Sequence, residues 1–438
     1  MKNIENQYLK KKNFKTLTPF KNRTPKQNRK KGFQILIFIS SLVTSALIYY
    51  YFFYESEELP LYLPSIYLNC DEKINNDDYV NCSFQLVDNK DLSNNINPMM
   101  AKIKIRGDLN AIRKKKGYRI ELSSNTELLG MRKDDDWALF AMYMDPERMR
   151  IKTCFELWRS LLPSNPTAIL PESKYVNLFL NGKFQGLYLL AEKQDKKLFG
   201  LDQAQNNINS SLIFQTKDPT YFKEYETGTW EQDWPNEDED IYIMDEILTD
   251  LFDFVNNTSN ETFFDSNIGI YSKFDKMNLI DNYIFNYFIL HGDFWFNNYF
   301  LIRNTNPNNF FICPWDFDCT FGHTGHEDYE PNFNSESEIR EKNELFNRLL
   351  NNGEFRQECM ERWFELRGTV WGEEHIFEIL SEIYGEIEHI LEIELRMWKP
   401  NLFKKKFNLD DYVSKLFDWI EERLIFCDSY FFNFTLTI

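Results

Sequence analysis

The residues best suited to chemistry lie in one segment, 291–322, which reads HGDFWFNNYFLIRN…FFICPWDFDCTFG. Its first part has the pattern H-G-D-x4-N, in which Asp293 precedes Asn298 by five residues. A predicted β-hairpin separates this pattern from D-F-D, which supplies Asp316 and Asp318. Phosphoryl transfer needs a carboxylate beside the attacking hydroxyl and oxygen ligands that hold Mg²⁺ on the nucleotide phosphates. The segment therefore predicts metal-dependent phosphoryl transfer.

The order and spacing of these residues carry more information than any one of them. Protein kinases use H-R-D-x4-N, a hairpin and then D-F-G, in the same order. On that comparison Asp293 is the catalytic carboxylate, and Asn298 and Asp316 are metal ligands. Taken alone, Asp316 and Asp318 also suit a surface turn, a calcium site or the D-x-D motif of a glycosyltransferase. The chain contains no G-x-G-x-x-G, so it is not an ordinary protein kinase.

A kinase also needs a cation for the phosphates and a surface for adenine. Lys115, in RKKKGYRIEL (113–122), is the candidate cation because it stands at the start of a predicted strand. The sequence alone does not separate it from Lys114 and Lys116. The strand GLYLLAEKQ (186–194) is the candidate adenine-binding hinge, and a purely structural hairpin strand explains it equally well.

The first half of the chain must then supply a sheet to carry these groups. Alternating apolar and polar residues, or short apolar runs, predict strands near 101–106, 118–122 and 137–143. Asp145-Pro146-Glu147 predicts the start of a helix that runs to about Leu161. Two further strands surround the Asn181-Gly182 turn at 174–192. We expect a mostly antiparallel sheet with a helix packed on it.

The second half is predicted to be mainly helical. Residues 218–245 are polar and acidic and suggest an exposed insertion. Helical periodicity begins at Lys273, a strand pair follows at 299–303 and 310–313, and nearly everything beyond Glu336 has helical spacing. The fold class we expect is α+β, with a sheet-rich first lobe and a helical second lobe.

The charge of the chain is divided between two regions. The 438 residues carry a net charge of −18, yet residues 1–32 hold eleven Lys or Arg and one acid. Residues 33–54, FQILIFISSLVTSALIYYYFFY, carry no charge and are long enough to cross a bilayer. A cleaved signal peptide fits less well, because the run is long and ends in bulky aromatics. The basic residues before it predict a cytosolic N-terminus and a type II single-pass protein.

This topology gives the main body of the chain a lumenal or extracellular location. All seven cysteines follow the predicted span, and an odd number leaves at least one thiol outside intrachain disulfides. Cys313 and Cys319 bracket the D-F-D loop and suggest either a disulfide or two free thiols. The acidic balance argues against nucleic acid as a partner. Sequons for glycosylation occur at Asn81, Asn209, Asn256, Asn257, Asn260 and Asn433.

At this point the sequence resembles a known family, the CotH-type spore-coat protein kinases, an atypical branch of the protein-kinase-like fold. The resemblance runs from Ala101 to Trp398, and its blocks are 105–122, 134–150, 176–193, 291–304 and 314–322. It implies a kinase that uses ATP and Mg²⁺ or Mn²⁺ to phosphorylate Ser or Thr of protein substrates.

The resemblance also implies roles for particular residues. Asp293 falls on the catalytic Asp. Asn298, Asp316 and Asp318 fall on positions that bind metal or support its ligands. The ATP-binding positions of the family correspond to Lys115 in K-K-x-Y, to Arg150 on the first helix and to Glu192 in G-x-Y-x-x-x-E.

The expected organisation is a two-lobed atypical protein-kinase-like fold behind an N-terminal transmembrane helix. Its parts are a basic cytosolic tail (1–32), the transmembrane helix (33–54), a stalk with leading strands (55–100), the sheet-rich N-lobe (101–215), an acidic insertion (216–272) and the helical C-lobe (273–438). Two alternatives remain open. One is a non-catalytic surface adhesin on a kinase-like scaffold, and the other is a Golgi-type D-x-D glycosyltransferase.

Overall fold

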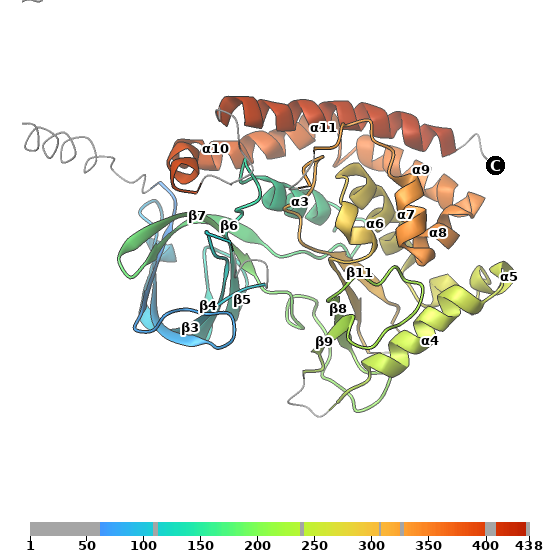
Figure 1. The fold of residues 1–438 in the computed structure, drawn as a ribbon, viewed down its shortest axis with the longest axis horizontal. Coiled ribbons are helices and arrows are strands. Elements are labelled where there is room, and N and C mark those ends of the chain that lie inside the picture. Colours follow the sequence, from blue (N-terminus) through green and yellow to red (C-terminus); the bar gives the residue numbers. More distant parts are fainter. Residues whose placement is uncertain are drawn as a thin grey trace, which may run out of the picture. The chain divides into compact units, whose positions relative to one another are not determined.

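Seven strands in the first half of the chain form a closed barrel (Figure 1). The computed structural model describes residues 62–107, 113–236, 241–305, 308–324, 328–398 and 409–434. The barrel strands are β1 (Ser65–Cys70), β2 (Val80–Val87), β3 (Ile96–Ile105), β4 (Tyr118–Glu127), β5 (Lys133–Phe140), β6 (Ser173–Leu180) and β7 (Lys183–Glu192). Their neighbours follow the order β1-β2-β3-β4-β5-β7-β6, and a parallel pairing of β1 with β6 closes the ring.

The alternation predicted for these strands is confirmed by their burial. Ile103 on β3, Ile120 on β4 and Trp137 on β5 are all buried in the apolar core of the barrel. Strands β1 and β2, which lie in the segment 55–100 predicted as a stalk with leading strands, belong to the same barrel. The predicted tail (1–32) and membrane span (33–54) lie outside the described residues. No helix among the described residues is both long and apolar enough to span a bilayer.

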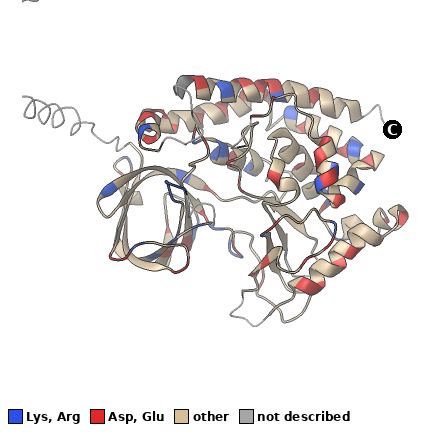
Figure 2. Cartoon of the chain, viewed as in Figure 1, with Lys and Arg blue, Asp and Glu red and all other residues tan. Residues whose placement is uncertain are grey.

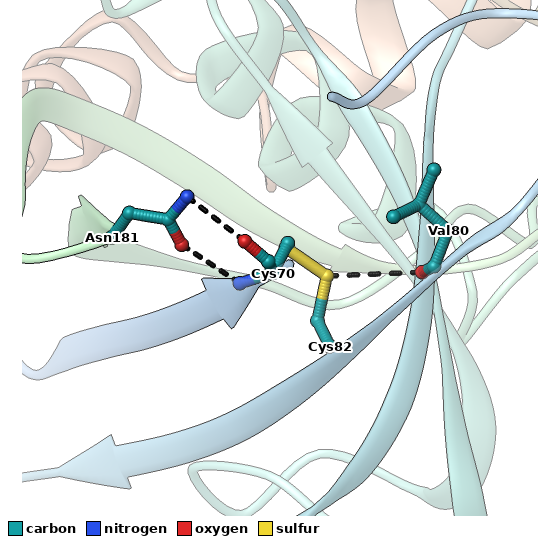
Figure 3. The surroundings of a disulfide bond; sticks show 4 residues. All are labelled: Cys70, Val80, Cys82 and Asn181. Atoms are coloured by element: carbon teal, nitrogen blue, oxygen red, sulfur yellow. Dashed lines mark hydrogen bonds between the residues drawn. A yellow bond between two sulfur atoms is a disulfide. The ribbon is translucent and has the colours of Figure 1, made fainter. Parts of the chain in front are cut away.

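The Asn181-Gly182 hairpin is confirmed and has a second role. Both residues have positive φ, +49° and +72°, which a tight hairpin turn requires. The Asn181 side chain accepts a hydrogen bond from the Cys70 N–H at 2.7 Å and donates to the Cys70 carbonyl at 3.1 Å (Figure 3). Cys70 forms a disulfide with Cys82, its partner across β1 and β2. The barrel is therefore fastened where its first strand meets the β6–β7 turn.

The first helix begins later than predicted. Helix α3 spans Arg150–Arg159, whereas the sequence predicted a start near Asp145. The Asp145 carboxylate accepts a hydrogen bond from the Arg150 N–H at 2.8 Å, so it satisfies a backbone donor at the start of the helix although Asp145 itself precedes the helix. Arg148, between them, has φ +60°, a left-handed conformation that ends any helix running through it. Leu157 and Trp158 of α3 are fully buried.

A four-stranded antiparallel sheet links the barrel to the helices. Its order is β11-β10-β8-β9, with strands β8 (Leu212–Thr216), β9 (Trp230–Trp234), β10 (Tyr299–Arg303) and β11 (Phe311–Pro314). Strand β9 corrects the expectation of an exposed insertion at 216–272. Trp230 and Trp234 lie at the two ends of β9, on either side of a β-bulge, and are only 3% and 4% exposed. Strand β9 is therefore packed into the folded core, despite the acidic composition around it.

Helices account for most of the remaining chain, as predicted. They are α4 (Met244–Asn257), α5 (Asn260–Phe263), α6 (Lys276–Phe288), α7 (Glu336–Lys342), α8 (Glu344–Leu350), α9 (Gly353–Arg367), α10 (Glu373–Met397) and α11 (Leu409–Phe432). Acidic residues stand along α4 and α10 (Figure 2). The isoleucine stripe of α10 is buried at Ile376, Ile383, Ile387 and Ile390. Helix α10 contacts both α3 and β7, so it connects the helical part to the barrel.

Candidate active site

The β10–β11 hairpin brings two predicted metal ligands together. Its last registered pair is Tyr299 with Pro314, and one step further the Trp315 N–H donates to the Asn298 carbonyl at 2.8 Å. Asn298 and Asp316 flank this point and have φ +58° and +64°. A left-handed backbone is costly for residues other than glycine, and such conformations cluster at functional sites. The hairpin therefore holds an amide and a carboxylate side by side in unusual conformations.

Two cavities meet at Asp316. The first, which we call the barrel-side cavity, has a volume of about 490 Å³ and is lined by Asn298 and Asp316 together with Arg106 at the end of β3. The second, the helix-side cavity, has a volume of about 370 Å³ and is lined by Asp293, Asp316 and Asp318. Because Asp316 lines both, a group held in one cavity can contact a group held in the other at this residue.

The predicted catalytic residue faces the helix-side cavity. Asp293 lies on a short 3₁₀ turn, Gly292–Trp295, that follows α6, and its side chain is exposed. Asp318 is partly buried and forms an ion pair with Arg113, with 3.2 Å between Arg113 Nη1 and Asp318 Oδ2. The sequence interpretation singled out lysines in the run 113–116 and passed over Arg113, although it belongs to the same basic segment.

Several negative charges share this small space, and they shift one another's pKa. Asp316 keeps solvent contact through the cavities, but surrounding protein partly desolvates it. This desolvation and the charges of Asp318 and Asp293 raise the pKa of Asp316 to about 7, against the opposing effect of Arg106 and Arg113. The pKa of Asp293 is also raised, first by desolvation, with Lys342 opposing the shift. Such clustered carboxylates favour a bound cation, which would relieve their repulsion.

Three asparagines of α6 that the sequence interpretation missed support β11, the strand that leads into the D-F-D loop. Asn278, Asn282 and Asn286 follow one another at intervals of four along α6 and are fully buried. Asn278 accepts from the Ile312 N–H at 2.7 Å, and Asn282 donates to the Ile312 carbonyl at 3.0 Å. These bonds fix β11 on the helix. Three buried amides with one spacing in an apolar helix are a detectable sequence signal.

His291 continues this support to the loop itself. Its Nδ1 lies 3.0 Å from Asn286 Oδ1, and its ring lies beside the backbone of Asp316 and the ring of Phe317. Burial lowers the pKa of His291 to about 3, so the imidazole is neutral at working pH. His291 is therefore a positioning residue for Asp316 and not an acid–base group.

Lys115, the predicted phosphate-binding cation, does not line either cavity. Its side chain is fully buried, and Nζ lies 2.7 Å from Glu394 Oε1 of α10 and bonds to the Leu187 carbonyl. Burial lowers its pKa to about 8, with Glu394 opposing the shift. Arg106 is one of five cationic residues that line the barrel-side cavity: its guanidinium lies 3.9 Å from the centre of the Phe140 ring, and Asp316 acts on its charge.

Arg150 and Glu192 are also set back from the cavities. Arg150 Nη1 donates to the carbonyls of Thr320 at 2.6 Å and Phe321 at 3.1 Å, so it holds the chain just beyond Cys319. Glu192 accepts from the N–H groups of Arg132 and Glu172 at 3.0 and 2.9 Å. Both are structural supports here. The residues after Glu192, Lys193 and Gln194, do line the barrel-side cavity, where the hinge was expected.

The cysteines near the loop are free thiols. Cys313 is buried in β11 and Cys319 is partly exposed beside Asp318, and they form no disulfide with each other. The sequence left open either a disulfide or two free thiols, and the structure has two free thiols.

The oxygen donors at this junction suit a hard divalent cation that is shared with a substrate. Within the described ranges, no group of three or more His, Cys, Asp and Glu side chains has the arrangement of a complete metal site. Mg²⁺ usually takes one or two carboxylates from the protein and completes its shell with water and substrate phosphates. Asp316, Asp318 and the amide of Asn298 are hard donors of that kind, so these residues fit a metal–nucleotide site.

Comparison with known proteins identifies the family of the chain. Residues 103–427 match the family model described as CotH kinase protein. The chain therefore belongs to the CotH kinase protein family, as the sequence resemblance predicted. Inner spore coat protein H of Bacillus subtilis (strain 168) is 27% identical over 262 residues, which cover 56% of this chain and 64% of that protein's length.

Two solved structures show a weaker likeness. A crystal structure of the Golgi casein kinase is 11% identical, has a TM-score of 0.29 and matches over 86% of this chain and 74% of that one. A structure of the Golgi casein kinase with Mn/ADP bound is also 11% identical, with a TM-score of 0.26 and coverage of 78% and 74%. Likenesses at this level define neither the fold nor the site of this chain.

Proposed function

We propose that this chain is a metal-dependent protein kinase that transfers the γ-phosphate of ATP to a Ser or Thr hydroxyl of a protein substrate. The observation that supports this most directly is the shared position of Asp316. It lines the barrel-side cavity with Asn298 and the helix-side cavity with Asp293. A donor nucleotide and an acceptor hydroxyl in adjoining cavities would meet at this carboxylate.

In this proposal each cavity has one substrate. The nucleotide occupies the barrel-side cavity, where Arg106 offsets phosphate charge and the Lys193–Gln194 segment faces adenine. The acceptor hydroxyl enters the helix-side cavity, where Asp293 orients it and accepts its proton. Asp316, Asp318 and Asn298 would hold Mg²⁺ or Mn²⁺, which supplies charge neutralisation on the phosphates when bound. The raised pKa of Asp293 suits a proton acceptor better than an ordinary surface aspartate does.

The proposal extends to location. We infer a type II membrane protein in which residues 33–54 cross the bilayer and the catalytic body is lumenal or extracellular. The charge asymmetry around that apolar run supports this orientation, and the Cys70–Cys82 disulfide is compatible with an oxidising compartment. Protease treatment of sealed microsomes tests it: the body should be protected, and its digestion would contradict the assignment.

The function is tested with the full-length chain purified in a mild detergent. Incubation with labelled ATP and Mg²⁺ or Mn²⁺ should transfer label to the chain itself or to a mixed protein acceptor, with the label on Ser or Thr. Asp293→Asn and Asp316→Asn should each reduce transfer by at least about 10²-fold while the fold is retained. Equal transfer by the Asp316→Asn variant would rule out the assigned site.

One observation favours a second function, a non-catalytic binding protein on the same scaffold. The expected lysine is committed to Glu394 and does not face the nucleotide. A chain of that kind would fold normally yet show no metal-dependent thermal stabilisation by ATP. Stabilisation by ATP with Mg²⁺, and none by a UDP-sugar, would support the kinase over both this alternative and a glycosyltransferase.

A further inference from the structure

We infer that Arg113 is the cation that acts on the phosphoryl group during transfer, from the acceptor side of the site. This inference rests on the proposed kinase function and names a residue that neither the motif pattern nor the family resemblance assigned. It also gives separate roles to the two arginines near the D-F-D loop: Arg106 for the bound nucleotide and Arg113 for the group in transit.

The first step of the argument is the position of Arg113. It lines the helix-side cavity together with Asp293, Asp316 and Asp318, and it is absent from the described walls of the barrel-side cavity. Arg106 lines the barrel-side cavity and is absent from the described walls of the helix-side cavity. The phosphoryl group must leave the nucleotide and reach the hydroxyl beside Asp293, so it passes from the cavity of Arg106 to the cavity of Arg113.

The second step compares Arg113 with two nearby lysines. Lys115 is fully buried and pairs with Glu394. Lys342 lines the helix-side cavity and its charge acts on Asp293, but its Nζ pairs with Glu338 at 3.0 Å on the more exposed surface of α7. Arg113 is only 23% exposed, and its ion-pair partner is Asp318, itself a proposed metal ligand. A guanidinium offers five N–H donors in a planar fork, so Arg113 can keep Asp318 and still donate to a phosphate oxygen.

The third step is the chemistry. In the transfer, the acceptor oxygen forms a bond to the γ-phosphorus while the bond from that phosphorus to the bridging oxygen breaks. ADP leaves with the electron pair, and the hydroxyl proton passes to Asp293. Negative charge on the equatorial oxygens needs a fixed donor at the moment of transfer. Arg113 is held by its ion pair at the cavity where that charge arrives.

The arrangement makes an unusual prediction, because Arg113 should help transfer and hinder metal binding. Its positive charge sits 3.2 Å from Asp318 and therefore opposes a cation there. In the full-length chain, Arg113→Gln should lower kcat by about 10²-fold with little change in the KM for ATP. The same variant should bind Mn²⁺ on the order of fivefold more tightly in the absence of nucleotide, measured by electron paramagnetic resonance. Arg113→Lys should recover part of the lost kcat.

Lys102→Gln is the matched control, because Lys102 forms an ion pair of the same 3.2 Å length with Glu121 on the barrel strands. It should change neither kcat nor Mn²⁺ affinity. Unaltered kcat in Arg113→Gln would overturn the inference. So would a joint loss of kcat and Mn²⁺ affinity, which indicates a purely structural ion pair. A wild-type chain that transfers no phosphate would instead overturn the proposed function, and this inference with it.

Discussion

The ammonium of Lys115 lies 2.7 Å from the carboxylate of Glu394, and neither side chain is exposed to solvent. Arg148 Nε lies 3.0 Å from the same carboxylate oxygen, and the other oxygen of Glu394 accepts from the Leu187 N–H at 2.9 Å. Gly186 has no Cβ, and a Cβ there would collide with Glu394. One carboxylate of α10 thus fixes the loop before β4, the segment before α3 and strand β7.

Lys115→Met should consequently act on stability more than on nucleotide binding. Arg148 still compensates Glu394 in this variant, but the buried Leu187 carbonyl and Glu394 each lose a donor, so we expect a cost of about 1–3 kcal/mol. Urea unfolding of the metal-free chain measures this free energy. Lys114→Met, at an exposed position of the same loop, should change it by no more than about 0.5 kcal/mol. A folded, stable Lys115→Met chain that had lost only ATP binding would restore the lysine to the active site.

The pKa of Asp316 predicts how pH affects the metal-free protein. Because this pKa is raised from 3.8 to about 7 in the folded state, the folded chain holds a proton that the unfolded chain releases. The resulting contribution to stability is fully present below pH 3.8 and is lost as pH rises towards 7. Asp316→Asn should therefore melt higher than the wild type at pH 8 with EDTA, and the difference should shrink at pH 5.

Added Mg²⁺ supplies the matching control for that prediction. A cation at the carboxylates replaces the proton, so Mg²⁺ should raise the melting temperature of the wild type at pH 8 more than at pH 5. The Asp316→Asn variant should lose most of this Mg²⁺ response. An equal response in both chains would mean that the cation binds elsewhere.

Arg150 should influence metal binding without contacting metal. Its two hydrogen bonds hold the carbonyls of Thr320 and Phe321, just beyond the D-F-D loop. Arg150→Lys keeps the positive charge but lacks the planar guanidinium, so the two carbonyls lose hydrogen bonds that hold the loop in place. We expect Mn²⁺ affinity to fall by about 10-fold, as for other groups that orient metal ligands. Arg159→Lys, at the partly buried C-terminal end of the same helix, is the control and should leave the affinity unchanged.

The Cys70–Cys82 disulfide should stabilise the barrel without affecting the active site. The two cysteines are twelve residues apart, and closing a loop of that size contributes about 3 kcal/mol by restricting the unfolded chain. The double variant Cys70→Ser, Cys82→Ser should have a free energy of unfolding, measured in urea, that is lower by that amount. Its ATP affinity at low temperature should be unchanged. Reductant should reproduce the effect in the wild type and have none in the variant.

Local sequence patterns predicted most of the elements, because each depends on its own residues. The Asn181-Gly182 turn and the alternation through Ile103 or Ile120 determine strands that form in the barrel. Strand β9 was missed because its acidic neighbours dominated the composition, and because a β-bulge interrupts the alternation between Trp230 and Trp234. The late start of α3 depends on the backbone at Arg148, which the Asp145-Pro146 signal does not reveal.

The site shows the same division between local and distant information. Asp293, Asn298, Asp316 and Asp318 belong to one short segment, so their order and spacing alone suggested a common site. The partner of Lys115 is Glu394, 279 residues further along the chain, and no local pattern indicates that contact. Arg106 and Arg113 gain their roles only when the barrel is set beside the β10–β11 hairpin.

The closure of the barrel by β1 also determines how the molecule would carry mechanical load. Any tension on the chain before Tyr62 enters the fold through β1, which is hydrogen-bonded on both edges, to β2 and to β6. Peeling can proceed no further than Cys70, because the disulfide to Cys82 passes the force to the next strand. A pull on this end of the chain would therefore act first on a strand that a disulfide joins covalently to its neighbour.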